Sequence, residues 1–132
     1  MPQLQLLLTI IVVGFLVNFP WELLHSTLYK IKLPKEKTIP FLAKMALKDG
    51  IWIALLYGIT SKIFSNTNIT QNPAQLLTFI LLALALSFAI EKISLKLNRW
   101  QYHKTMPLIF GVGATPLLEI PLTGIVTFLI VF

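Results

Sequence analysis

Long apolar segments dominate this sequence and constrain its fold more than any other feature. The chain has 132 residues, of which 56% are hydrophobic and 12% charged, and its mean hydropathy is +0.80. Soluble domains carry roughly 25% charged residues, about twice this share. A small domain leaves much of its surface in water and cannot hide so many apolar side chains. The composition therefore excludes an ordinary soluble enzyme and a disordered regulator, and it predicts an integral membrane protein.

The apolar segments divide into four predicted membrane spans within a single transmembrane domain, residues 1–132. Each segment is long enough to cross roughly 30 Å of hydrocarbon as an α-helix. The second span is the least apolar, because Lys44, Lys48 and Asp49 lie in its first third. We therefore predict an all-α, multi-pass four-helix bundle in the cell membrane. Its spans are expected at about residues 4–29, 41–64, 73–97 and 106–132.

Cationic residues gather in alternate connections between these spans. In the first and third connections they are Lys30, Lys32, Lys35, Lys37, Arg99 and Lys104. The second connection, residues 65–72, carries no charge. Because lysine and arginine mark cytoplasmic loops, connections one and three are expected in the cytoplasm and both termini outside. This placement explains most of the net charge of +6 without nucleic acid, so membrane lipids are the expected partners.

One acidic residue falls in each predicted span. These residues are Glu22, Asp49, Glu91 and Glu119. A charged side chain at the bilayer centre costs about 2.5 to 3.5 kcal/mol on insertion scales, so each needs a partner, water or a proton. With a rise of about 1.5 Å per residue, the first three lie roughly 9 to 12 Å inside the cytoplasmic ends of their spans, and Glu119 roughly 18 to 20 Å. We expect a polar layer in the cytoplasmic half of the membrane.

Glu22 and His25 form a Glu-x-x-His pair on one face of the first predicted helix. Histidine titrates near neutral pH, so the pair could exchange a proton with a lipophilic substrate that enters from the bilayer. Glu91 is expected to orient these two residues or to share a proton with them. We therefore predict Glu22, His25 and Glu91 as the catalytic group. The residues predicted to contribute to binding are Asn18, Trp21, Tyr29, Asp49 and Glu119.

Other interpretations of the same polar residues stay open. A Glu-x-x-His pair also occurs in di-metal carboxylate proteins, but only one pair is present here, and we predict no metal and no cofactor. The protein could be a small proton-coupled carrier that works as a homodimer, since four short helices barely enclose a pathway. It could also be an accessory subunit whose polar residues clasp helices together, at about 0.6 to 2 kcal/mol per hydrogen bond. Whether it is an enzyme is left undecided.

Two short motifs resemble the signatures of an uncharacterised family of small four-span bacterial membrane proteins. The motifs are N-F-x-W-E at residues 18–22 and R-W-x-Y followed by M-P within residues 99–107. The resemblance implies four spans and no particular activity. Members of that family often have glutamine where His25 and Glu119 stand here. Independently of the resemblance, Trp100 and Tyr102 beside Arg99 are expected to form an aromatic belt at the membrane interface.

A second resemblance, to the small subunits of heterodimeric carotenoid (lycopene) cyclases, concerns the order of aromatic residues and acids. Trp100-x-Tyr102 is followed by Pro116-x-x-Glu119, similar to a motif whose carboxylates are thought to protonate a polyene. The paired second carboxylate of that motif is absent, because Ile120 follows Glu119. This resemblance implies an isoprenoid-like class of substrate.

Overall fold

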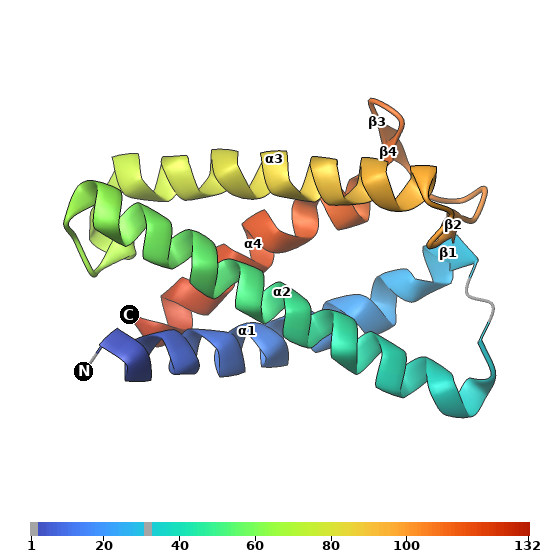
Figure 1. Cartoon of the computed structure of the whole chain (residues 1–132), viewed down its shortest axis with the longest axis horizontal. Coiled ribbons are helices and arrows are strands. Elements are labelled where there is room, and N and C mark those ends of the chain that lie inside the picture. Colours follow the sequence, from blue (N-terminus) through green and yellow to red (C-terminus); the bar gives the residue numbers. More distant parts are fainter. Residues whose placement is uncertain (1–2, 31–32) are drawn as a thin grey trace.

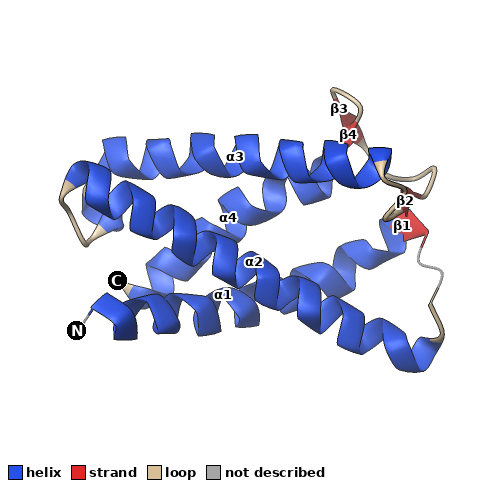
Figure 2. Cartoon of the chain, viewed as in Figure 1, coloured by secondary structure: helices blue, strands red, loops and turns tan. Residues whose placement is uncertain are grey.

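The computed structural model describes residues 3–30 and 33–132 and consists mainly of helices (Figures 1 and 2). The α-helices are α1 (Gln3–His25), α2 (Lys35–Phe64), α3 (Pro73–Lys96) and α4 (Ala114–Val131). Two short 3-10 helices are η1 (Ser26–Leu28) and η2 (Ile69–Gln71). The strands are β1 (Tyr29–Lys30), β2 (Gln101–Tyr102), β3 (Leu108–Ile109) and β4 (Val112–Gly113). β1 pairs antiparallel with β2, and β3 with β4.

Three helices in the described part of the chain are long and apolar enough to cross a membrane. They cover Gln3–Leu28, Pro73–Lys96 and Ala114–Val131. The predicted second span, 41–64, lies on α2, whose first half carries Lys44, Lys48 and Asp49. The helical character and the membrane-protein composition are thus confirmed. Lys32, one of the predicted cytoplasmic cations, lies outside the described residues.

The last helix begins later than the sequence predicts. A span was expected from residue 106, but β3 and β4 form a hairpin before α4 starts at Ala114. Phe110 and Gly111 at the turn have φ angles of 52° and 79°. This left-handed conformation makes a tight turn and excludes a right-handed helix, and glycine adopts it without steric cost.

Apolar side chains cover the outside of the helices while polar ones are buried between them. Leu4 and Leu24 of α1 are 69% and 79% exposed, whereas Asn18 of the same helix is fully buried. On α3, Leu81 is exposed and Ser87 is buried. This arrangement is the reverse of a water-soluble surface. It suits helices that are surrounded by lipid, because hydrocarbon offers polar groups no partners.

α1 and α2 cross where Gly14 meets Gly50. A Cβ atom on Gly50 would lie 2.7 Å from the carbonyl oxygen of Ile11, and one on Gly14 would lie 3.0 Å from the Cα of Gly50. Small residues permit such close approach between membrane helices. Beyond this crossing the two helices separate toward the end where β1 and β2 pair (Figure 1).

A second contact brings α3 against α4. The Phe79 ring sits where a side chain on Gly124 would be, since a Cβ there would lie 2.4 Å from the ring atom Cζ. Phe79 also packs edge-on against Phe128, with ring centroids 4.8 Å apart. Phe79 and Phe128 belong to the buried apolar core, together with Ile10 of α1 and Ile53 of α2.

We predict that replacing Gly50 by alanine destabilises the protein. The added methyl group would collide with the α1 backbone, and overpacking of this kind typically costs about 1 to 3 kcal/mol. Gly58 of the same helix is the matched control, because its nearest neighbour for a Cβ is a Leu7 methyl 4.0 Å away. Unfolding measurements in detergent should show a lower free energy of unfolding for Gly50→Ala and no change for Gly58→Ala. Equal stability of the two variants would contradict the close crossing.

We also predict the orientation of the chain in the membrane. Both ends of the chain lie at the end of the molecule opposite to β1 and β2 (Figure 1). The chain has no cysteine, so single cysteines introduced at the exposed positions Thr67 and Lys104 report each end cleanly. A membrane-impermeant maleimide should label Thr67→Cys in intact cells, and Lys104→Cys only after permeabilisation. The opposite labelling pattern would reverse the predicted topology.

Candidate functional site

A cavity of about 370 Å³ lies among the four helices near the β1–β2 pair. This volume falls within the range of sites for small molecules, about 300 to 1,000 Å³. The ionisable side chains predicted for the polar layer all line it, namely Glu22, His25, Asp49, Glu91 and Glu119. Its apolar wall includes Phe41, Leu42, Met45, Ile90 and Ile120. Residues that are far apart in the sequence therefore meet at one cavity.

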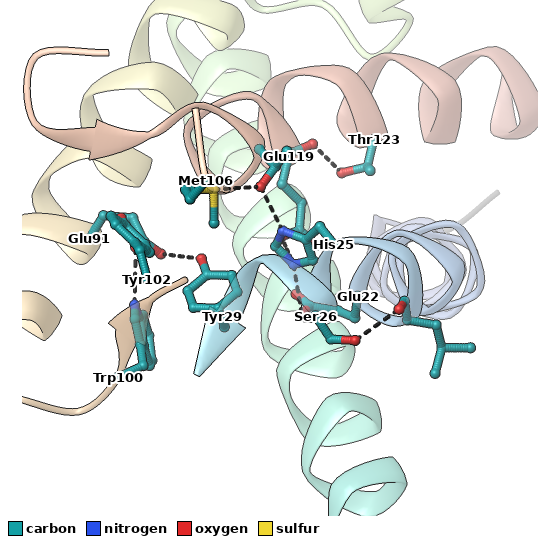
Figure 3. A network of polar contacts seen from close by, with 12 residues as sticks. Glu22, His25, Ser26, Tyr29, Glu91, Trp100, Tyr102, Met106, Glu119 and Thr123 are labelled. Atoms are coloured by element: carbon teal, nitrogen blue, oxygen red, sulfur yellow. Dashed lines mark hydrogen bonds and ion pairs between the residues drawn. The ribbon is translucent and has the colours of Figure 1, made fainter. Parts of the chain in front are cut away.

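Glu22, His25 and Glu119 form the centre of the site. α1 places Glu22 and His25 one turn apart, and α4 brings Glu119 toward them (Figure 3). His25 Nε2 lies 3.1 Å from Glu22 Oε2 and 3.7 Å from Glu119 Oε1. The three residues are only 6%, 7% and 5% exposed. The imidazole nitrogen thus faces two buried carboxyl groups from different helices.

Asp49 of α2 adds a third carboxyl group. It is partly buried and lines the same cavity as Glu22 and Glu119. Within the described ranges, His25 is the only basic side chain within 4 Å of any of these acids. Three neighbouring carboxylates repel one another strongly where water is scarce. The cluster therefore requires additional positive charge, in the form of bound protons or a cation.

The second ring nitrogen of His25 is held by Thr115 of α4. His25 Nδ1 lies 3.1 Å from Thr115 Oγ1, and the same hydroxyl donates to the sulfur of Met106 at 3.4 Å. A hydroxyl group both donates and accepts, so Thr115 can orient the imidazole in either tautomer. The contact leaves Nε2 as the nitrogen that faces Glu22 and Glu119.

Glu91 of α3 forms a separate polar centre with three aromatic donors (Figure 3). Tyr102 OH donates to Glu91 Oε2 at 2.6 Å and Trp100 Nε1 to the same oxygen at 3.1 Å. Tyr29 OH donates to the other oxygen, Oε1, at 3.4 Å. These donors come from β1, β2 and the loop before β2. Glu91 thereby ties the segments that close one end of the cavity to α3.

Tyr29 stands between the two polar centres. Its ring lies edge-on to His25, with centroids 5.3 Å apart, and it packs against Trp100 and Tyr102 at 6.2 and 5.4 Å. Burial and the hydrogen bond to Glu91 raise the pKa of Tyr102 above its ordinary value. The Tyr102 hydroxyl therefore stays protonated, and remains a donor, at neutral pH. Tyr29 thus contacts Glu91 through its hydroxyl group and the cluster around His25 through its ring.

Two residues predicted to bind lie beside the cavity and do not line it. Asn18 is buried and donates to the Gly14 carbonyl oxygen at 2.8 Å, one turn back along α1. Trp21 packs edge-on against His25, with ring centroids 6.3 Å apart. Neither belongs to the residues that line the cavity. Both support α1 close to the site, and Trp21 contacts the imidazole ring directly.

Trp100 and Tyr102 are functional-site residues that the sequence analysis placed elsewhere. They were expected in an interfacial belt, but both point inward to Glu91. Trp100 follows α3 after a turn at Asn98, whose φ angle is 53°. That left-handed residue reverses the chain and carries the indole back onto α3. No local pattern signals this reversal, because asparagine at a helix end is common and does not specify where the chain turns next.

The chain matches no protein-family model, no curated protein and no solved structure. The two family resemblances therefore stay predictions.

We predict that Tyr102→Phe destabilises the protein through loss of its hydrogen bond to Glu91. Hydrogen bonds to charged groups contribute about 1.5 to 3 kcal/mol, and neutral ones about 0.5 to 1.5 kcal/mol. Tyr57→Phe is the matched control, since its hydroxyl donates to the Thr67 carbonyl oxygen at 2.7 Å. Unfolding measurements in detergent should show a larger loss of stability for Tyr102→Phe than for Tyr57→Phe. A larger loss for Tyr57→Phe would argue against a charged, triply bonded Glu91.

Proposed function

We propose that this chain is a multi-pass protein of the cell membrane that binds a lipophilic, isoprenoid-like molecule and exchanges a proton with it. The observation that supports this proposal is the composition of the cavity near the β1–β2 pair. One side is apolar, and the other presents the buried Glu22–His25 pair. A molecule with an apolar body and one reactive position suits such a site, because the apolar wall binds the body and the polar pair meets the reactive atom.

The lining of the cavity also contains a polar group that lacks a hydrogen-bond partner among the described residues. Ser87 of α3 lines the cavity, and its buried hydroxyl has no hydrogen-bond partner in residues 3–30 and 33–132. Buried polar groups are normally hydrogen-bonded. A ligand with one oxygen atom, such as a prenyl alcohol, would satisfy this hydroxyl. Ser87 thus favours an oxygen-bearing lipophilic molecule over a pure hydrocarbon.

In the proposed reaction, Glu22 and His25 act as the acid–base pair. Thr115 contacts Nδ1, so the proton would be taken up or given at Nε2 or on the neighbouring Glu22 carboxyl group. The aromatic donors on Glu91 engage both of its oxygens, which suits a positioning role better than proton transfer. Asp49 and Glu119 keep additional proton sites next to the pair. The mechanism needs no group beyond this chain and its ligand.

Binding and proton exchange can be tested separately in the purified protein. Trp100 lines the cavity, so farnesol is expected to quench tryptophan fluorescence in a saturable way. In D₂O, the bound prenyl compound should exchange carbon-bound hydrogen for deuterium, as detected by mass spectrometry. Glu22→Gln should retain binding and slow exchange by about 10²- to 10⁴-fold, the usual contribution of a general acid–base group.

Glu36→Gln is the matched control, because Glu36 is an exposed acid that does not line the cavity. It should change neither farnesol binding nor deuterium exchange. Absence of saturable quenching in the unmodified protein would refute the proposed ligand class. Proton flux in liposomes without a prenyl compound, lost in Glu22→Gln, would instead favour the carrier interpretation. If Glu22→Gln merely lowers the amount of folded protein, the polar cluster is a structural clasp.

A further inference from the structure

Glu22, His25 and Glu119 converge on one point in a way that suits a metal ion. One potential ligand atom from each residue lies within 4.8 Å of the other two. Metal ligands sit about 2.0 to 2.2 Å from a divalent transition metal, so adjacent ligand atoms are separated by about 3 to 3.7 Å. The distances from His25 Nε2 to the two glutamates, 3.1 and 3.7 Å, fall in this range.

The orientation of His25 favours a cation as well. Histidines that bind metals almost always donate the other ring N–H to an oxygen acceptor, which aims the free lone pair at the ion. His25 Nδ1 lies 3.1 Å from Thr115 Oγ1, which can accept from Nδ1–H and so fix the ring. In that tautomer Nε2 presents a lone pair toward Glu22 and Glu119. Three electron-rich atoms that face one another need a positive charge between them.

Glu119 supplies an independent observation. Its second oxygen, Oε2, is buried and has no hydrogen-bond partner anywhere in the described chain. Buried carboxylate oxygens normally accept hydrogen bonds or bind a cation. Asp49 lines the same cavity. The exposed cations that line the cavity, Lys30 and Arg99, form no ion pair with these acids among the described residues.

We infer that Glu22, His25 and Glu119 bind one divalent transition-metal ion. Carboxylate oxygens together with one imidazole suit Mn²⁺, Fe²⁺ or Zn²⁺, whereas Ca²⁺ and Mg²⁺ prefer ligand sets made only of oxygen. From the sequence we predicted no metal, because the chain contains only one Glu-x-x-His pair. The third ligand comes from α4. The ion would occupy the Nε2 lone pair and the Glu22 carboxylate that the proposed function uses for proton exchange. This inference therefore concerns the metal-loaded protein, and it requires no lipophilic ligand.

Metal binding can be measured on the full chain in detergent after treatment with a chelator. Titration calorimetry with Mn²⁺ and with Zn²⁺ should show one saturable site per chain. Glu119→Gln, which removes a charge and keeps the size of the side chain, should weaken binding at least about tenfold. Thr115→Val should weaken it by about 10- to 100-fold, the usual effect of removing a group that orients a ligand. Bound Mn²⁺ should show magnetic coupling to a nitrogen, which His25→Gln abolishes.

Glu36→Gln is the matched control, since Glu36 is an exposed acid that does not line the cavity. It should leave the metal affinity unchanged. Absence of a saturable site in the unmodified protein would overturn the inference, and so would equal weakening by Glu36→Gln and Glu119→Gln. If Glu119→Gln does not fold, the metal affinity of Thr115→Val and the magnetic coupling of Mn²⁺ to nitrogen test the inference instead. Farnesol quenching without metal binding would refute this inference alone, and metal binding without quenching would refute the proposed function alone.

Discussion

The burial of four carboxyl groups among apolar helices is the constraint on which the rest of this structure depends. Each group is costly away from water unless it has a partner, and lipid offers none. The protein meets this requirement in two different ways. Glu91 accepts hydrogen bonds from three neutral aromatic donors. The second group of acids, Glu22, Glu119 and Asp49, has a single imidazole nearby, that of His25. One oxygen of the Glu119 carboxyl group has no hydrogen-bond donor in the described chain.

These two solutions divide the structural and functional roles of the polar layer. The saturated Glu91 centre ties β1 and the loop before β2 to α3, so it shapes one end of the cavity. The unsaturated cluster around His25 is energetically poor as a clasp, because a partly satisfied polar network costs more than an apolar core would. Such a cluster is expected where a proton, a cation or a ligand completes it. Ionisable residues inside a membrane segment generally mark functional sites for this reason.

Local patterns predicted the helices and the composition of the polar layer. Period-3.6 geometry places Glu22 and His25 on one helix face whatever the remainder of the chain does, and their contact in the structure follows from that spacing. The start of α4 was mispredicted, since Met106 and the apolar residues after it look helical. A hairpin turn at Phe110 and Gly111 interrupts them. The inward turn of Trp100 and Tyr102 was also missed, because it depends on a left-handed residue, Asn98, and on a partner nine or more residues away.

The sequence by itself determined that this chain has membrane-protein composition, that it is helical, and that its few acids are the residues of interest. Only the tertiary structure decided which acids meet. It grouped Glu119 with Glu22 and His25, and it gave Glu91 separate partners. The physical reason is that spacing along one helix sets which side chains share a face. The depth and angle at which another helix presents its residues depend on contacts such as Gly14 with Gly50, and Phe79 with Gly124. Those contacts join distant parts of the chain, and no local pattern contains them.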